Sequence, residues 1–463
     1  MKLDKFVVPA SASMREALQH IESNHHGMIF ITEPNGSVCG VATDGDIRRR
    51  MLAGGSLDDS VGTCANQDFV WEEPATPREI LLKKLDHRIR VIPLLDSARR
   101  LVGVVSRNHI PIQDECAIYA RARAPVRISF GGGGSDLTHY FSTKVSGAVI
   151  NSTISLYCHA TLKLLDNEQV IIHSLDLGET LESDDLQSAI NHQGRFGLVQ
   201  ALLRVINPDF GFELFLHSDF PMKSGLGGSA ALSASILGCF NQFRRDQWDQ
   251  HELAEIAYQA ERHYLGVSGG WQDQYASVFG GFNFMEFRMD QNIVHPLRIN
   301  QEVLLELEES LVLCDTGTIH DSGDIHNDQC NQMASAHVQS LVETNVELSY
   351  EMRNYLLRGR LHQFGESLDK AWQFKRQFSD KISSEQLDRI YEEAKLNGAI
   401  GGKLLGAGGG GFFLFYTPPY QKHKLITHLK NSGLSVNSFR FEPEGMQAWS
   451  VRESKNQHDN EIL

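Results

Sequence analysis

The sequence predicts a protein of at least two domains, each containing both helices and strands, and three observations support this. The chain has 463 residues, which is longer than one ordinary domain. Residues 1–112 contain an internal repeat, and the rest of the chain places three glycine-rich segments beside strand-like or helical runs. A hydrophobic content of 41% and a charged content of 22% are typical of soluble globular domains.

The N-terminal repeat consists of three pairs of matching segments at one constant offset of 63 positions. The pairs are MREAL from Met14 with PREIL from Pro77, GMIFI from Gly27 with RVIPL from Arg90, and GVATDGDI from Gly40 with GVVSRNHI from Gly103. A constant offset across separate matches predicts two copies of one unit. Each copy is expected to run helix, strand, turn, strand, helix.

The repeated unit resembles the CBS domain, so that residues 1–112 would form a CBS pair. In that family the last strand ends in Gly-h-h-Thr/Ser-x-x-Asp, where h is apolar, and Thr43 and Asp46 match this pattern in the first copy. The resemblance implies that both contact the ribose of a regulatory nucleotide. The second copy has Ser106 but carries His109 in place of the aspartate. The pair therefore either binds an effector or only dimerises and braces the enzyme, and a homodimer is expected.

Composition excludes several classes of protein. Lysine and arginine number 43 against 58 acidic residues, a net charge of −15, which argues against a nucleic-acid binder. The seven cysteines occur singly without a CxxC pair, as is typical of reduced thiols. The segment MKLDKFVVPASAS has too short an apolar core for a signal peptide, and no apolar run reaches about 18 residues. A cytoplasmic protein without a membrane partner is expected.

Beyond a boundary expected near Asp114, three glycine-rich segments occur in one domain. They are Gly131–Gly134, the stretch PMKSGLGGSA at 221–230, and the stretch KLLGAGGGGFFLF at 403–415. One such loop predicts no more than a turn. Because glycine lets the backbone approach a ligand closely, three together predict a binding site assembled from distant parts of the chain.

The segment at 221–230 is expected to bind phosphate. The Walker A pattern is absent, and Gly225, Gly227 and Ala230 fit the dinucleotide pattern G-x-G-x-x-A only in spacing. SDFPMKS separates them from the preceding strand, and no acidic strand end follows about 20 residues later. A glycine loop at a helix start still offers free amides and the positive end of the helix dipole. Ser229 would contact the phosphate or its metal, or cap the helix.

Three ordered motifs resemble those of the GHMP kinases, named for galactokinase, homoserine, mevalonate and phosphomevalonate kinases. They are RAPVRISFGGGGSD, PMKSGLGGSA and GAGGGGFF, within residues 120–450. One departure is Gly228, where the family motif has serine. The resemblance implies an α+β kinase with an S5-like N-terminal lobe at 120–300 and a ferredoxin-like C-terminal lobe at 301–452, preceded by the α/β CBS pair.

The resemblance also assigns roles to individual residues. Asp273 would contact the reacting hydroxyl beside Arg127, although a purely structural ion pair fits the same two residues. Glu261, which unaided would be solvated surface, would hold Mg²⁺ together with Ser229. The nucleotide phosphates would contact Lys223, Ser224, Gly225, Leu226, Gly227, Gly228, Ser229 and Ala230. The sugar would contact Asp136, Gly133, Gly134, Gly408, Gly409, Thr316 and Ser322. His320 and His326 are expected on the surface.

The resemblance implies an enzyme that uses Mg²⁺ and ATP to phosphorylate the anomeric C1 hydroxyl of a sugar or sugar phosphate. The motif segments are most similar to those of members that act on D-glycero-α-D-manno-heptose 7-phosphate, and fucose or a related sugar is the alternative. Lys223 and Arg123 are candidates for holding a C7 phosphate. An inactive nucleotide or sugar sensor is the rival class, but a sensor would not need Arg127, Ser229, Glu261 and Asp273 together.

Overall fold

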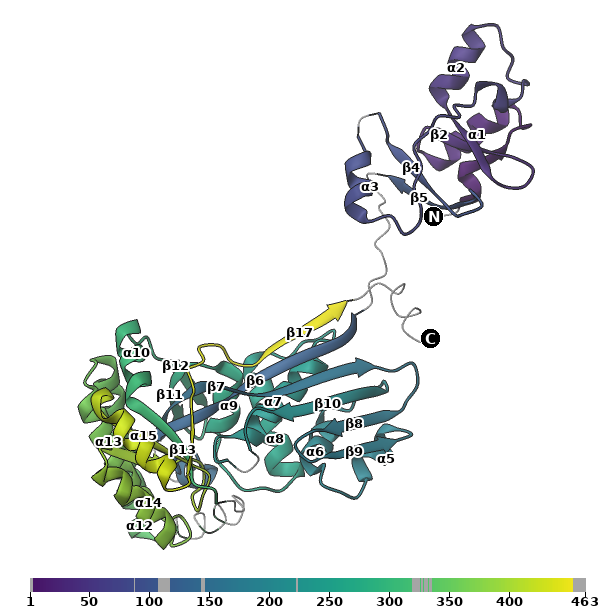
Figure 1. The fold of residues 1–463 in the computed structure, drawn as a ribbon. Helices are drawn as coiled ribbons and strands as arrows, with labels where there is room; N and C mark the ends of the chain where they lie inside the picture. Colours follow the sequence, from purple (N-terminus) through teal and green to yellow (C-terminus); the bar gives the residue numbers. More distant parts are fainter. Residues whose placement is uncertain are drawn as a thin grey trace. The chain divides into compact units, whose positions relative to one another are not determined.

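The computed structural model describes residues 3–86, 88–106, 117–142, 146–221, 224–318, 325, 328, 332 and 335–452 (Figure 1). The chain divides into two compact units, one within residues 1–115 and the other within residues 116–453. Among the described residues, no helix is long and apolar enough to cross a membrane.

The N-terminal unit confirms the predicted repeat. The first copy contains α1 (Met14–Asn24), β2 (Met28–Thr32), β3 (Val38–Thr43) and α2 (Asp44–Leu52), and the second contains α3 (Arg78–Lys84), β4 (Val91–Leu95) and β5 (Leu101–Ser106). The strands of the two copies start and end at the same offset of 63 positions. The final helix expected in the second copy falls outside the described residues. Short elements η1 (Leu3–Phe6), β1 (Val7–Pro9) and η2 (Val61–Cys64) complete this unit.

The alternation of side chains along β2 explains how the two copies pack against each other. On β2, Ile29 and Ile31 face the core beneath α1, whereas Phe30 joins a second cluster with Val91 and Leu95 of the other copy. Successive strand residues point to opposite faces, so one strand serves both its own copy and the interface between the copies.

The larger unit is built on an eight-stranded sheet. Its strands are β6 (Ala117–Gly131), β7 (Gly147–Leu164), β8 (Val170–Ser174), β9 (Glu179–Ser183), β10 (Phe212–Ser218), β11 (Phe282–Phe287), β12 (Asn292–Pro296) and β17 (Gln447–Arg452). The order is β12-β11-β7-β10-β8-β9, with β6 paired to β7 and β17 paired to β6. The long β7 pairs through 147–152 with β11 and through 158–164 with β10. Among the described strand pairs of this sheet, β8 with β10 is parallel and the others are antiparallel.

Helices α4 (Thr138–Phe141), α5 (Leu186–Asn191), α6 (Gly197–Ile206), α7 (Gly228–Asn241), α8 (Gln250–Gln259) and α9 (Gln272–Phe279) accompany this sheet. Helix α7 packs against β6 and β7, and almost every residue from Ala230 to Asn241 is buried. This environment explains the small side chains of ALSASILG, because a helix packed on several sides needs small residues to let its neighbours approach. Helix α8 continues directly into the π-helix η3 (Ala260–Tyr264).

A four-stranded antiparallel sheet with its helices forms the C-terminal lobe. Its strand order is β14 (Gly401–Leu404), β15 (Phe412–Tyr416), β13 (Leu311–Asp315), β16 (Ser435–Asn437). Around it lie α10 (Gln301–Ser310), α12 (Ala336–Leu357), α13 (Leu361–Lys375), α14 (Glu385–Leu396) and α15 (Pro419–Asn431), gathered at one end of the unit in Figure 1.

The last strand of the described chain does not follow the predicted boundary between the two lobes. Strand β17, inside the predicted C-terminal lobe at 301–452, returns to pair with β6 in the larger sheet. The two lobes also share one hydrophobic core, in which Phe130 of β6 meets Phe364 of α13 edge to face at 5.2 Å. This shared core fixes the C-terminal ends of β6 and α13 relative to each other, and the candidate site lies there.

Candidate active site

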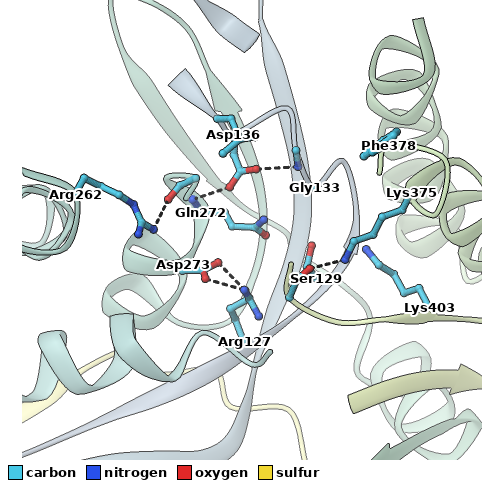
Figure 2. Close-up of a pocket in the computed structure, with 14 residues that line it drawn as sticks. Arg127, Ser129, Gly133, Asp136, Arg262, Gln272, Asp273, Lys375, Phe378 and Lys403 are labelled. Atoms are coloured by element: carbon cyan, nitrogen blue, oxygen red, sulfur yellow. Dashed lines mark hydrogen bonds and ion pairs between the residues drawn. The ribbon is translucent and has the colours of Figure 1, made fainter. Parts of the chain in front are cut away.

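The three glycine segments predicted to form one site do come together. A Cβ atom added at Gly225 would lie 2.8 Å from the Leu405 carbonyl oxygen, and one at Gly406 would lie 2.5 Å from the Gly225 Cα. Both glycines have positive φ, so close approach and backbone conformation each require glycine. The pocket beside this contact is shown in Figure 2, and its lining includes Gly133, Gly134 and Gly406.

Arg127 and Asp273 form a bidentate ion pair in this pocket. Arg127 on β6 donates from Nε to Asp273 Oδ1 at 2.8 Å and from Nη2 to Oδ2 at 2.7 Å. Its third nitrogen, Nη1, donates to the Gly225 carbonyl at 2.7 Å. The Arg127 side chain is 5% exposed, whereas that of Asp273, in the first turn of α9, is 24% exposed. A substrate can therefore reach the carboxylate while the guanidinium orients it from behind.

Asp136 occupies the opposite side of the pocket as a buried carboxylate (Figure 2). The Gly134 N–H donates to Oδ1 at 3.0 Å and the Gln272 N–H donates to Oδ2 at 3.3 Å. Burial, together with the nearby Asp273 charge, raises the pKa of Asp136. Gln272 Oε1 is buried in the same lining without a hydrogen-bond partner among the described residues. The two side chains present acceptors suited to sugar hydroxyl groups.

The position of the Asp136 carboxylate requires glycine at residue 270. A Cβ atom at position 270 would lie 1.8 Å from Asp136 Oδ2. We expect Gly270→Ala to displace Asp136 and to raise KM for the sugar that the sequence predicts to bind there roughly 10-fold or more, the equivalent of one hydrogen bond to a charged group. Steady-state kinetics would show an unchanged KM for ATP; an unchanged KM for the sugar would contradict the role of Asp136.

Glu261 and Ser229 meet as the predicted metal pair. Ser229 Oγ donates to Glu261 Oε1 at 2.5 Å, and Gln274 Nε2 donates to Glu261 Oε2 at 2.6 Å. Arg262 lies 3.5 Å from the same carboxylate. Glu261 is buried inside η3, so the surface alternative for this residue is wrong. π-Helical turns within helices often occur at functional sites.

The start of α7 leaves its amides without a side-chain cap. Gly227 is the N-cap residue at φ +80°, and the helix has no side-chain capping hydrogen bond, so Ser229 does not cap it. A Cβ atom at Gly227 would lie 3.4 Å from Asp273 Oδ2, so the helix start adjoins the carboxylate. Leu226 and Ala230 bury their side chains in the core and can offer a ligand only their backbone. The arrangement suits an anion at the helix N-terminus.

Phe220 accounts for the glycine at position 228. A Cβ atom there would lie 2.9 Å from Phe220 Cε2, and Phe220 is buried. A serine at this position therefore requires a smaller or displaced neighbour.

We expect Gly228→Ser to lower the free energy of unfolding by roughly 1–3 kcal/mol through overpacking. The double variant Phe220→Leu/Gly228→Ser should recover much of this loss because the shorter side chain vacates the space. Chemical denaturation of the wild type, both single variants and the double variant measures the coupling; purely additive effects would show that the two sites are independent.

Several predicted substrate residues lie elsewhere. Thr316 is not in the pocket lining: its hydroxyl donates to the Gly411 carbonyl at 2.7 Å and fastens the glycine segment to β13. Gly408 and Gly409 pack against Ile382, whose carbonyl accepts from the Gly409 N–H at 2.7 Å. These three residues are not in the pocket lining, and their contact with a sugar stays a prediction. The Ser224 carbonyl accepts from the Phe412 N–H at 3.2 Å, and its contact with a nucleotide likewise stays a prediction.

Arg123, a candidate for a phosphate partner, is held by contacts outside this pocket. Its Nε donates to Gln447 Oε1 at 2.9 Å, its guanidinium lies 4.8 Å from the Tyr157 ring centroid, and it does not line the pocket. The other candidate, Lys223, lies outside the described residues, as do Ser322, His320 and His326.

Two buried lysines in the pocket were missed by the sequence analysis. Lys375 ends α13, and its Nζ donates to the Leu404 carbonyl at 3.1 Å and to the Gly406 carbonyl. Lys403 lies on β14 and is 3% exposed. Helical spacing would have revealed that Lys375 is buried, though not that it reaches the pocket, because Leu368, Ala371 and Trp372 place it on the buried stripe of α13.

In the N-terminal unit, Thr43 and Asp46 form a capping box at the start of α2. The Asp46 N–H donates to Thr43 Oγ1 at 3.1 Å and the Thr43 N–H donates to Asp46 Oδ2 at 2.8 Å. The pair thus closes a helix end. Its contact with a nucleotide ribose stays a prediction.

Comparison with known proteins identifies the family of this chain. Models of the N-terminal and C-terminal domains of the GHMP kinases match residues 196–281 and 352–432, and the CBS domain model matches 1–53 and 61–110. The D-glycero-alpha-D-manno-heptose 7-phosphate kinase of Campylobacter jejuni is 34% identical over 72% of this chain and 99% of its own length. The chain belongs to the GHMP kinase family. Its predicted fold class and its N-terminal CBS pair are confirmed.

Solved structures show the same GHMP kinase fold. A D-glycero-D-manno-heptose 1-phosphate kinase from Bacteroides thetaiotaomicron superposes with a TM-score of 0.60 at 27% identity, covering 72% of this chain and all of that one. A Lactococcus lactis galactokinase with bound galactose gives a TM-score of 0.59 at 17% identity over 71% of this chain and 95% of that one.

Proposed function

We propose that this GHMP kinase transfers the γ-phosphoryl group of ATP to the anomeric C1 hydroxyl of a sugar, with D-glycero-α-D-manno-heptose 7-phosphate as substrate. The observation that carries the proposal is the Arg127–Asp273 pair, which lines the pocket and adjoins the uncapped start of α7. The Campylobacter jejuni relative, named for heptose 7-phosphate, supports this choice of sugar.

The acceptor hydroxyl would lie between Asp136 and Asp273. Asp136 and Gln272 hold neighbouring hydroxyls, and Asp273 accepts a hydrogen bond from the reacting hydroxyl and points its oxygen at the γ-phosphorus. Arg127 holds both Asp273 oxygens and so fixes that direction. Phosphoryl transfer depends chiefly on positioning and charge neutralisation, which this geometry provides.

The phosphates of ATP would lie at residues 225–230. Their negative charge is stabilised by the free amides of the α7 N-terminus. Ser229 Oγ and Glu261 Oε1, 2.5 Å apart, are two hard oxygen donors at this helix start and fit Mg²⁺, whose remaining ligands are commonly water and phosphate. When bound, Mg²⁺ neutralises charge on the β- and γ-phosphates.

A coupled ADP-release assay tests the proposal. Purified full-length protein with Mg²⁺-ATP is offered heptose 7-phosphate, fucose, galactose and mannose separately, and the product is analysed for a phosphate at C1. Turnover is expected with heptose 7-phosphate. Turnover with fucose alone would favour the alternative suggested by an L-fucokinase/L-fucose-1-P guanylyltransferase of Bacteroides fragilis, 26% identical over 67% of this chain and 36% of that one. Absence of turnover with every one of these sugars would refute the proposed kinase activity.

We further propose that the CBS pair binds a regulatory nucleotide and that the protein is a homodimer. Thermal-shift measurements on the full chain with adenine, guanine and cytidine nucleotides, repeated on Asp46→Asn, test the first point. A shift that the variant lacks supports it, and no shift with any nucleotide leaves only the structural role. Light scattering of the pure protein gives the oligomeric state.

A further inference from the structure

The pocket holds more positive charge than its own carboxylates neutralise. Four cationic side chains line it, against two carboxylates, Asp136 and Asp273: the cations are Arg127, Arg262, Lys375 and Lys403. Arg127 is paired with Asp273, and Arg262 lies 3.5 Å from Glu261. Among the described residues, Lys375 and Lys403 form no ion pair with any carboxylate. The excess charge therefore resides on the two lysines.

These lysines and one hydroxyl present unused donors to the same end of the pocket. Lys375 uses two of its three N–H groups on the Leu404 and Gly406 carbonyls. Lys403 Nζ has no hydrogen-bond partner within the part of the chain that the structure describes, and the same holds for the buried Ser129 hydroxyl on β6. Figure 2 shows all three across the pocket from Arg262.

Burying an ammonium group without a carboxylate partner is unfavourable, and the pKa values of the two lysines reflect this cost. Desolvation, reinforced by the charge of Arg127, lowers the pKa of Lys375 to about 7. Desolvation, followed by repulsion from Lys375 and Arg127, lowers the pKa of Lys403 well below its usual value. Without a ligand, apolar side chains in these positions would stabilise the fold. A doubly charged anion bound between the two lysines would offset the free-energy cost of burying them.

We propose that Lys375, Lys403 and the Ser129 hydroxyl form a subsite for a phosphomonoester group carried by the sugar substrate. This inference rests on the proposed function and assigns the end of the pocket that binds the sugar's own phosphate. The γ-phosphate of ATP is the other source of the same chemistry, because Gly406, which accepts from Lys375, touches Gly225 of the nucleotide segment. The experiment must separate these two sources.

Lys403→Met, Lys375→Met and Ser129→Ala test the subsite, with Lys424→Met on the exposed side of α15 as the matched control. Calorimetry on the full-length protein compares two pairs of ligands, heptose 7-phosphate with its parent heptose and mannose 6-phosphate with mannose. Wild type should bind each phosphorylated sugar more tightly than its parent. Lys403→Met should weaken the phosphorylated ligands roughly 10- to 100-fold, as for hydrogen bonds to charged groups. Affinities for the parent sugars and for ATP should stay within about twofold in the same comparison.

A stability measurement separates binding from a structural role. Removing a buried unpaired charge should leave the Tm of Lys403→Met equal to or above that of the wild type, whereas a structural lysine would give a lower Tm. An affinity loss for ATP instead of the sugar phosphate would assign the lysines to the γ-phosphate and overturn the proposal, as would a wild type that does not distinguish phosphorylated from parent sugars. Binding of mannose 6-phosphate and mannose is measured independently of turnover. This comparison therefore still tests the subsite if heptose 7-phosphate is not turned over, a result that would contradict the proposed function alone.

Discussion

Asp273→Asn is expected to lower kcat by roughly 10²- to 10⁴-fold, the range for loss of a positioned acid–base group. The amide keeps the shape of the carboxylate but loses the negative charge that accepts the hydrogen bond of the reacting hydroxyl. Because Asp273 lies beside the α7 start without contributing to it, KM for ATP should change little. Steady-state kinetics with saturating sugar and ATP, and nucleotide titration followed by fluorescence, measure the two effects separately.

Breaking the Arg127–Asp273 ion pair also affects stability, and a second variant separates this effect from the loss of activity. Arg127 is almost fully buried, so Asp273→Asn leaves a buried cation partly unpaired and costs stability, at most the roughly 3–5 kcal/mol of a broken buried pair. In Arg127→Met/Asp273→Asn no unpaired charge remains, and stability should largely return while activity does not. Recovery of activity together with stability would show that the pair is only structural.

Sequence reasoning identified residues that the structure brings together where those residues stand in a short local pattern. The glycine segments, Asp136, Ser229 and Glu261 each stand in a short motif, and a motif carries its own local geometry. Their convergence was inferred from the number of glycine segments, and the Gly225–Gly406 contact confirms it.

What the sequence could not show depends on long-range packing. Lys375 reaches the pocket only because α13 packs against β6 through Phe364 and Phe130, a contact between residues more than 200 positions apart. Arg123 was a candidate for a phosphate partner, yet it lies where β17 returns to pair with β6 and does not line the pocket. The Gly228 departure also became explicable only when Phe220 was seen beside it.

The second prediction with a large expected effect concerns Ser229 and Glu261, the pair proposed to hold Mg²⁺. We expect Ser229→Ala and Glu261→Gln each to weaken the apparent affinity for Mg²⁺, measured as the Mg²⁺ dependence of kcat at fixed ATP, by at least about 10- to 100-fold. Ser229→Ala removes the one serine hydroxyl that this segment offers at the start of α7, since Gly228 supplies none. Glu261→Gln can keep the hydrogen bond from Ser229, but it removes the negative charge and replaces the oxygen that accepts from Gln274 Nε2 with an amide N–H group.

The two variants therefore distinguish a metal site from a structural hydrogen bond. If the Ser229–Glu261 contact served only to hold η3 against α7, Glu261→Gln would retain it and leave the Mg²⁺ dependence unchanged, while Ser229→Ala would lower only the Tm. A metal role requires both variants to need more Mg²⁺, and excess Mg²⁺ should restore part of the lost rate. Mn²⁺, bound through the same oxygen donors, should be weakened in parallel when titrated by electron paramagnetic resonance in the presence of ATP.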